Sequence, residues 1–580
     1  MEMAPIILKK PAVSVPVLPD PIVEPIQPSS VIVIHPGSMY LRIGRASDQF
    51  PRVVRHVIAR RNRIGPVPVH KDEYLMPLTN MTPELVSQLD EIHNAISSVL
   101  ASCLTREGRL RYSVPLQVIA EYNKDTRPDV VCGKSDVNWT SLEEGQEYVI
   151  GDEVLYLKPE ENFNIHWPIR RGQLNVHSGI GGSLRSVLSD LETIWGTVIH
   201  KYLEIPVKDL KSYRAVLIIP DVYKRDHVKE MVNVLLTKLG FLSCFIHLES
   251  VCATFGAGVS YACVVDVGDQ KTAVSCVEDG ISHRNTRLSL NYGGNDITRY
   301  FSWLLEKSNF PYRCHPEKII LDSTLMQELK EKFCHVNLDV CGAQNRSFNL
   351  IRPCEPVIKY SMKVGDECLI APLALFHPEL LSLTGPKKIR VQPRYEGSHE
   401  DPHDEVYLIQ TQRRAVKDTT EGLCEQSFCE ETPLNSSVLD EDLDSTDQPP
   451  NISLKDSDQD LNYDQIFGID QAIMQSIDRC DSDELKAKMY SCILVVGGGM
   501  MIHGIHTWLR NRLQVQIPII FRSEHFEIIT RPKDMDPRYT VWKGAALMSC
   551  LDTAQELWIK QKEWLKYNVK ILREKAPFTW

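Results

Sequence analysis

The chain has 580 residues, of which 24% are charged and 43% hydrophobic, and its formal net charge is −11. This length predicts two or more domains of ordinary globular composition, and the negative charge argues against a generally basic nucleic-acid binder. No apolar run reaches transmembrane length, no secretory signal is recognisable and the 16 cysteines contain no C-x-x-C pair, so we expect no zinc ribbon, no membrane association and a cytoplasmic or nuclear protein with reduced cysteines.

The N-terminal region predicts an extended arm followed by a hairpin. Residues 1–30 are rich in proline and lack hydrophobic periodicity, which is typical of a flexible arm. Val31–Ile34 is predicted to be a buried strand that turns at His35-Pro36-Gly37-Ser38 and returns as a second strand, Met39–Gly44. The basic stretch Arg52–Arg63 has two interpretations, a solvated loop face or a contact to phosphate or to a partner.

Helices and strands alternate over the following region, which indicates α/β layers. A helix is predicted at Thr82–Leu104, because Thr82 is a suitable N-cap before a proline and a glutamate. Ser183–Tyr202 carries apolar residues at helical spacing along one face. Further helices are predicted at Lys224–Leu239, Ser250–Gly258, Asp296–Lys307 and Leu325–Val336, and further strands at Ala215–Ile219 and Cys244–His247.

The hairpin predicted at Tyr261–Val277 carries the main candidate site. Two apolar strands flank the polar turn Asp266-Val267-Gly268-Asp269-Gln270. Gly268 would let backbone N–H groups approach a phosphate closely, while Asp266 and Asp269 would offer oxygen ligands to a divalent cation. The alternative is an ordinary hairpin, in which Asp and Gly are simply favourable turn residues. The similar hairpin near the N-terminus and a glycine turn further along the chain favour the phosphate interpretation.

The C-terminal region begins after an acidic insertion. Residues 396–462 are acidic, Ser-rich and poor in aromatic residues, so we expect them to be disordered. Ser491–Val496 is a predicted strand that leads into Gly497-Gly498-Gly499 and a helix, Ile505–Arg512, an arrangement that brings backbone close to a nucleotide. It matches neither the Rossmann nor the P-loop pattern. Helices are also predicted at Asp470–Asp478 and Trp542–Trp558.

Several long motifs resemble the actin family. They are ESVCATFGAGVSYACVVDVGDQKT, RNTRLSLNYGGNDITRYF, LKEKFCHVNLD and YTVWKGAALMSCLDTAQELWIKQKEW. Within that family, NIHWPIRRGQLN, VVGGGMMIHGI and ITRPKDMDP are similar to an actin-related subunit of the INO-eighty chromatin-remodelling complex. The resemblance implies an α/β, actin-like ATPase fold with large insertions. Its two lobes would each contain a mixed five-stranded sheet flanked by helices, with the nucleotide in the cleft between them.

The resemblance also implies which residues hold the nucleotide. ATP or ADP is the implied ligand, and Mg²⁺ is the implied metal, held by Asp266 and Asp269 through water. Without the resemblance, Lys330 and Glu331 would be interpreted as an ordinary solvated helix face. The first phosphate loop would be Gly37, Ser38 and Met39, the second Asp266, Val267, Gly268 and Asp269, with Lys330 and Glu331 flanking the adenosine and Gly498 and Gly499 beneath it.

Three departures from the actin pattern predict poor hydrolysis. His35 stands where actin has an Asp in the first loop, and neutral imidazole is a poor ligand for Mg²⁺. Glu249 and Ala273 stand where actin has the Gln and the His that orient the attacking water. Because phosphoryl transfer depends on positioning and electrostatics, we expect ATP binding with weak turnover at most. The alternative is that Glu249 acts as a general base and restores turnover.

The resemblance finally implies an organisation and a function. The first lobe would comprise 31–180, with an enlarged insertion, 181–260 and the returning segment 541–580, and the second lobe 261–395 and 463–540. The implied function is a nuclear, ATP-binding scaffold subunit of a chromatin remodeller that supports transcription regulation, DNA repair and recombination. Expected partners are the actin-binding helix of the remodeller ATPase subunit, actin and other actin-related proteins, and histones of the nucleosome.

Two expectations concern alternatives to that function. DNA contact would come from local basic clusters such as Arg52–Arg63, and the chain should remain a monomer. The rival class is an active ATPase or kinase of the superfamily that unites actin, sugar kinases and heat-shock ATPases. A kinase needs a base carboxylate and a sugar pocket, and the sequence identifies neither.

Overall fold

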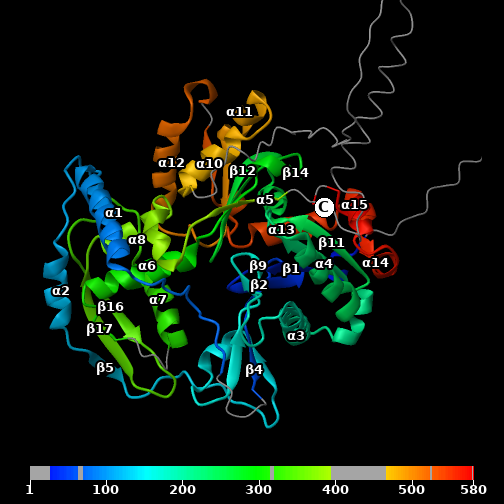
Figure 1. Cartoon of the computed structure of the whole chain (residues 1–580), viewed down its shortest axis with the longest axis horizontal. Helices are drawn as coiled ribbons and strands as arrows, with labels where there is room; N and C mark the ends of the chain where they lie inside the picture. The colour runs from blue at the N-terminus through cyan, green and yellow to red at the C-terminus, as the bar shows by residue number, and fades with distance from the viewer. Residues whose placement is uncertain (1–25, 63–68, 314–318, 394–464, 523–525, 578) are drawn as a thin grey trace, which may run out of the picture.

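A computed structural model describes residues 26–62, 69–313, 319–393, 465–522, 526–577 and 579–580. The acidic insertion expected at 396–462 and the arm up to residue 25 lie outside the described residues. The chain forms two lobes, each built on a mixed β-sheet (Figure 1). Among the residues described, no helix is both long enough and apolar enough to cross a membrane.

The first sheet contains the N-terminal hairpin predicted from the sequence. β1 pairs antiparallel with β2, with Ile34 opposite Ile43, and parallel with β10 on its other side. Val31 to Ile34 are completely buried, as expected for an apolar run that forms a central strand. In the order β21-β11-β10-β1-β2-β3, the strands are Ile559–Lys560, Ser243–Leu248, Arg214–Ile219, Val31–Pro36, Tyr40–Arg45 and Arg52–Arg55.

The second sheet repeats the plan of the first. β12 pairs antiparallel with β13, with Asp266 opposite Ala273, and parallel with β19 on its other side. Each sheet thus contains five strands of the same arrangement, with short edge pieces added: β21 in the first, β14 and β18 in the second. The strands of the second sheet are β12 (Tyr261–Val267), β13 (Thr272–Glu278), β14 (Ile281–Ser282), β15 (Leu288–Leu290), β18 (Ile389–Val391), β19 (Cys492–Val496) and β20 (Glu527–Ile529).

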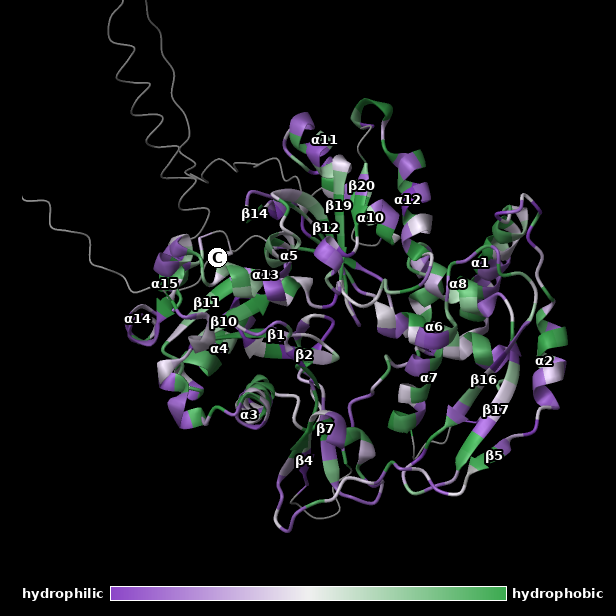
Figure 2. Cartoon of the chain, turned by 180° about the vertical axis from the view of Figure 1, so that it is seen from behind, coloured by the Kyte–Doolittle hydropathy of each residue, from purple (hydrophilic) through white to green (hydrophobic). Residues whose placement is uncertain are grey.

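Two helices, α5 (Glu249–Ala257) and α13 (Thr540–Met548), pack against each other between the sheets. Small residues allow the close approach, because a Cβ on Gly544 would overlap the carbonyl oxygen of Cys252. The indole Nε1 of Trp542 donates to the carbonyl of Val33 at 3.1 Å, which ties the C-terminal region to β1. The strands of both sheets are mostly hydrophobic, whereas hydrophilic residues collect on outer helices such as α11 and α12 (Figure 2).

Most predicted helices form, with shifted ends. Thr82 caps the first, since its hydroxyl accepts a hydrogen bond from the Leu85 backbone N–H at 3.3 Å. The helix predicted to extend to Leu239 changes to a π-helix over its last turn, Val234–Lys238. The helices are α1 (Pro83–Ser102), α2 (Leu116–Lys124), α3 (Leu184–Leu203), α4 (Arg225–Asn233), α6 (Gly294–Lys307), α7 (Ile319–Phe333), α8 (Glu367–Leu373), α10 (Ile469–Asp478), α11 (Asp483–Ser491) and α12 (Ile505–Gln516).

The insertion expected within the first lobe is divided between the two lobes, which corrects its placement. β4 (Ile58–Arg61), β6 (Tyr148–Ile150) and β7 (Phe163–His166) form a small sheet below the first lobe. In contrast, β5 (Asp129–Cys132) pairs with β17 (Val357–Val364), which also pairs with β16 (Gln344–Leu350) of the second lobe. α1 buries Leu89, Ile96 and Leu100 in the second-lobe core, at the left of Figure 1. The amphipathic face of α1 therefore decides where the insertion packs.

The prediction of one long helix over Trp542–Trp558 is wrong. α13 ends at Met548, a 3-10 helix occupies Asp552–Leu557, and Ile559 pairs with Cys244 in the first sheet. The buried indole of Trp558 packs on Phe245, with ring centroids 5.5 Å apart. Strand pairing and burial of this indole override helical propensity. Two short helices follow, α14 (Gln561–Tyr567) and α15 (Lys570–Lys575).

Candidate functional site

A cavity of about 590 Å³ lies between the two lobes. It is lined by the loops after β1, β12 and β19 and by α7. Val267 is the one implied residue whose side chain does not line it, because that side chain is buried in the core while its carbonyl accepts the Gly499 N–H at 2.8 Å. The other implied residues all line the cavity: Gly37, Ser38, Met39, Glu249, Asp266, Gly268, Asp269, Lys330, Glu331, Gly498 and Gly499.

The first loop is closed tightly and supported from below. The Gly37 N–H donates to the Tyr40 carbonyl at 3.0 Å, and a Cβ on Gly37 would lie 2.7 Å from that oxygen. His56 is completely buried beneath the loop, with Nδ1 2.9 Å from the Gly37 carbonyl and Nε2 accepting from the Trp195 indole at 3.3 Å. Burial lowers the pKa of His56 to about 4, so the neutral ring donates through Nδ1. His56 is absent from the predicted site residues because it lies inside the basic stretch.

The second loop brings two carboxylates to the cavity, the buried Asp266 and the half-buried Asp269. The Gly268 N–H donates to the Lys271 carbonyl at 2.9 Å, which forms the turn. Burial, followed by the charge of Glu249, raises the pKa of Asp266 to about 7. Burial also raises the pKa of Asp269 to about 6, against the opposing effect of Lys330. These shifts mean that an additional cation beside the loop would stabilise the ionised carboxylates.

The third loop requires glycine at Gly497, a residue absent from the implied set. Its φ is +89°, and a Cβ there would overlap the carbonyl oxygen of Val267 and lie 2.6 Å from Asp266 Oδ1. Gly498 faces only the side chain of Arg538, whose Cγ would be 3.6 Å from a Cβ. The three-glycine run was the available signal, and both its first member, Gly497, and its last, Gly499, touch the second phosphate loop.

Glu249 is held between two nitrogen groups in the cavity wall. Its carboxylate pairs with the Lys271 ammonium, and His35 Nε2 lies 3.3 Å from its Oε1. Burial alone would raise the pKa of Glu249, but the Lys271 charge and the His35 hydrogen bond outweigh it and hold that pKa well below its usual range. Glu249 is therefore a weak base. Ala273 is buried in β13 and does not line the cavity.

Two cationic residues of this wall were missed in the sequence. Lys271 is 8% exposed and follows the acidic turn directly, so a lysine at the start of a buried strand was the available signal. Arg42 also lines the cavity, on β2, and burial lowers its pKa while the Asp266 charge opposes that shift. On α7, Lys330 Nζ donates to the Gly294 carbonyl at 3.0 Å, whereas Glu331 is exposed and accepts from Gln327 at 2.9 Å.

These groups fit a nucleoside polyphosphate. The glycine-closed loops line the cavity, and the cationic side chains of Arg42, Lys271 and Lys330, which line it too, complement phosphate charge. Asp266 and Asp269 also fit a divalent cation held through water, because both are carboxylates of one turn that lines the cavity. The imidazole of His35 contributes no oxygen ligand, so the metal shell is weaker than one with a third carboxylate.

A hairpin from the insertion joins the two lobes at the phosphate loops. It consists of β8 (Ile169–Arg170) and β9 (Gln173–Leu174), and its tip lines the cavity. Arg171 Nη2 donates to Asp296 Oδ1 at 2.9 Å in the second lobe, while the Gly172 N–H points to Ser38 Oγ at 3.5 Å in the first. The hairpin therefore fixes the two phosphate loops relative to each other.

Three arginines of the basic stretch Arg52–Arg63 make intramolecular contacts, while Arg63 lies outside the described residues and the DNA contact stays a prediction. Arg55 Nε pairs with Asp152 at 2.7 Å, and Arg60 Nε pairs with the buried Asp190 at 2.5 Å. Arg61 lies over the Phe163 ring, 5.1 Å from its centroid. The charges of Arg55, Arg60 and Arg61 therefore support the β4 region of the fold.

Comparisons with known proteins agree with this geometry. The family model described as Actin matches residues 26–577. The chain is 46% identical over 582 residues to actin-related protein 8 of Bos taurus, covering 96% of this chain and 93% of that protein. It is 47% identical over 563 residues to actin-related protein 8 of Aedes aegypti, covering 96% and 99%. It is also similar to the solved structure of human actin-related protein Arp8 in its ATP-bound state, with a TM-score of 0.81, 43% identity and coverage of 97% and 100%.

Proposed function

This chain belongs to the actin family, and from that premise we propose that it is a nuclear, ATP-binding scaffold subunit of a chromatin-remodelling complex with little or no turnover. Its fold is the actin-like ATPase fold with insertions. The ATP half of the proposal is supported by the cavity and by a solved relative described in an ATP-bound state. The low-turnover half rests on one observation, the Glu249 carboxylate fixed by Lys271 and His35.

The chemistry of that wall opposes hydrolysis. A general base works best when its pKa lies near the working pH, and the neighbours of Glu249 move its pKa in the opposite direction. Its two oxygens are already occupied by Lys271 and His35, which leaves it poorly placed to orient water. Asp266 and Asp269 would hold Mg²⁺ through water, and the ion would neutralise phosphate charge when bound. Binding is thus favoured over turnover.

The partner half of the proposal rests on similarity to actin-related protein 8 relatives. The net charge of −11 suits basic histone surfaces better than bare DNA. The intramolecular roles of Arg55, Arg60 and Arg61 add to that preference for a protein contact. We therefore propose histones of the nucleosome, the remodeller ATPase subunit through its actin-binding helix, and actin or other actin-related proteins as partners.

One experiment tests the nucleotide half. The purified full chain is heated with ATP and Mg²⁺, with ATP and EDTA, and without nucleotide, and phosphate release is measured on the same preparation. We expect ATP to raise the melting temperature, Mg²⁺ to add to that shift, and phosphate release to be far slower than from filamentous actin. Turnover comparable to that of actin, abolished by Glu249→Gln, would replace the scaffold proposal with an active ATPase.

A second experiment tests the partner half. The full chain, alone and within its native complex, is used to capture histones H3–H4 and free duplex DNA at low and moderate salt. We expect histone capture to exceed DNA capture, and any DNA capture to fall steeply with salt. Absence of histone association at low salt in both forms would contradict the proposed chromatin contact without affecting the nucleotide result.

A further inference from the structure

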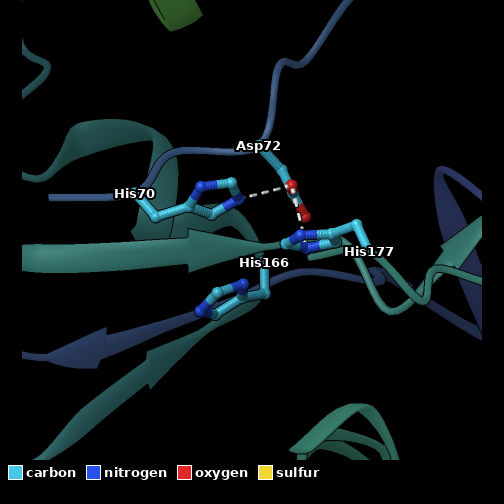
Figure 3. Close-up of side chains that lie close together, drawn as sticks. All are labelled: His70, Asp72, His166 and His177. Atoms are coloured by element: carbon cyan, nitrogen blue, oxygen red, sulfur yellow. Dashed lines mark hydrogen bonds and ion pairs between the residues drawn. The ribbon is translucent and has the colours of Figure 1, made fainter. Parts of the chain in front are cut away.

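Three histidines and one aspartate converge at the end of β7 (Figure 3). His70 and Asp72 lie at the start of the segment that begins at residue 69. His166 ends β7, and His177 follows β9. One donor atom from each residue can be chosen so that all four lie within 4.8 Å of one another. The four residues are separate from those that line the cavity, so the nucleotide site does not explain them.

The aspartate is oriented by backbone and amide groups. Asp72 Oδ2 accepts from the Trp167 backbone N–H at 2.9 Å and from Asn175 Nδ2 at 3.1 Å. Its other oxygen, Oδ1, faces the imidazoles, 3.0 Å from His70 Nε2 and 3.8 Å from His177 Nε2. One oxygen is thus satisfied by the fold while the other remains directed at the histidines, an arrangement typical of a ligand with outer-shell support.

The imidazoles are stacked and partly enclosed. The His70 ring lies 4.8 Å from the His177 ring and 5.5 Å from the His166 ring, measured between centroids. His166 is 5% exposed, so its ring is almost fully enclosed by the protein. A glycine loop covers the rings, because a Cβ on Gly181 would overlap the His166 ring and one on Gly182 the His177 ring. Larger residues in this loop would force the cluster apart.

We propose that His70, Asp72, His166 and His177 bind a divalent transition-metal ion, for which Zn²⁺ is the best match. Neutral imidazole nitrogens with one carboxylate oxygen are ligands that Zn²⁺ takes, and four protein donors form a closed, structural site. Mg²⁺ and Ca²⁺ require mainly oxygen ligands, which this cluster does not supply. The site is independent of any cation at the phosphate loops.

Full coordination requires a local change at His177. The Gly179 N–H donates to His177 Nδ1 at 3.0 Å, so the metal-free ring carries its proton on Nε2. Coordination through Nε2 moves that proton to Nδ1 and turns the Gly179 amide away. The loop has glycine at 179, 181 and 182, and Gly181 has a φ of +76°, so its backbone has the freedom to make this change. Asp72 and His166 need no such change, whereas His70 must move to Nδ1 the Nε2 proton that it donates to Asp72 Oδ1 at 3.0 Å.

The ion would act as a structural clip at the base of the β8–β9 hairpin. His166 precedes that hairpin and His177 follows it, while His70 and Asp72 come from a separate segment, which hydrogen bonds such as Asp72 N–H to the Ile165 carbonyl at 2.9 Å already hold beside β7. Because the hairpin tip lines the nucleotide cavity, metal binding stiffens one wall of that cavity.

The test uses the full chain without a polyhistidine tag, stripped with chelator and titrated with Zn²⁺ by calorimetry and with Co²⁺ by visible absorption. We expect one equivalent of Zn²⁺ to bind and raise the melting temperature, and Co²⁺ to give the absorption of a tetrahedral ion. Asp72→Asn, His166→Gln and the more exposed His70→Gln should each abolish stoichiometric binding. Asn175→Ala, which removes only outer-shell support, should weaken binding by about 10–100-fold.

His200→Gln is the matched control, because His200 is exposed on α3 and distant in sequence from the cluster. It should leave the stoichiometry and the cobalt spectrum unchanged. Lack of stoichiometric Zn²⁺ binding by the wild-type chain would overturn the proposal. Equal Zn²⁺ binding by the wild type and by His70→Gln would also overturn it, provided that the two chains have the same melting temperature in chelator and are therefore equally well folded. ATP-induced stabilisation in chelator is an independent readout, so failure here would leave the nucleotide proposal standing.

Discussion

The Lys271 ammonium donates to the Glu249 carboxylate, and the pair lies buried in the wall of the interlobe cavity. Glu249 begins the helix between the sheets, while Lys271 immediately precedes the second strand of the phosphate hairpin. The pair therefore links the first lobe to the second phosphate loop, and it fills the space in which a water-activating group would otherwise act.

Breaking this pair from one side should destabilise the protein. Lys271→Met leaves a buried carboxylate without its partner, and such changes typically cost about 3–5 kcal/mol. The double variant Lys271→Met, Glu249→Met should recover much of that loss, because neither charge is left buried. Chemical unfolding of the wild type, both single variants and the double variant measures the coupling; simple addition of the two single losses would show that the pair does not couple.

Two neighbouring glycines should respond differently to alanine. Gly497→Ala introduces a Cβ at positive φ against Val267 and Asp266, so it should displace the second phosphate loop and reduce ATP-induced stabilisation. Gly498→Ala meets only the flexible Arg538 side chain at 3.6 Å and should keep most of that stabilisation. Thermal shift with and without ATP compares the two variants, and equal behaviour would contradict the close approach described for Gly497.

ATP binding should depend on the second-loop carboxylate. At about a hundredfold excess over Kd, a ligand that binds only the folded state stabilises it by about 2.7 kcal/mol. Asp266→Ala should reduce the ATP-induced rise in melting temperature measured with Mg²⁺. The exposed Asp552→Ala, in the C-terminal region, is the control and should retain the full rise. A full rise in both variants would remove Asp266 from the site.

The buried His56 should make the protein sensitive to acid. Burial lowers its pKa from the ordinary 6.5 to about 4, so between these values the unfolded chain binds the proton that the folded chain excludes. Stability then rises with pH across this window and is lost as pH falls through it, by about 3 kcal/mol for a shift of this size. Unfolding from pH 4 to 7 should therefore show a shallower slope for His56→Asn, which keeps a donor for Gly37.

The exposed His200→Gln is the control for that measurement and should leave the slope unchanged. His166 and His247 have their pKa values lowered to about 4 by the same burial, so part of the slope should persist in the His56 variant. An unchanged slope in His56→Asn would show that the ring is not held neutral beneath the first loop.

The chain should remain a monomer with ATP and Mg²⁺. α1, α2 and β5 add a layer to the outer side of the second lobe, and a head-to-tail filament needs the same contact to repeat at every subunit. Sedimentation of the full chain with ATP and Mg²⁺ should give one species at all concentrations tested. Nucleotide-dependent polymer would contradict this prediction.

The sequence by itself determined the two hairpins, the glycine turn and the order of most helices. Apolar β-branched runs such as Val31–Ile34 form central strands, because a central strand is buried on both faces and therefore needs apolar side chains on both. The capping hydroxyl of Thr82 and the periodicity of the helix after Ser183 are local signals and need no tertiary information. The phosphate-loop residues could be anticipated because tight Gly-containing turns must be encoded locally.

Only the tertiary structure decided which distant groups meet. Lys271 and Glu249 are far apart in the sequence, and so are His70 and His166, so neither spacing nor composition reveals the ion pair or the proposed metal site. The tertiary structure also stopped the helix predicted to reach Trp558, because that indole packs on Phe245 and the next residue joins β11. Charge and side-chain chemistry are fixed by the sequence, but pairing, burial and the resulting pKa values depend on the fold, which brings remote segments together.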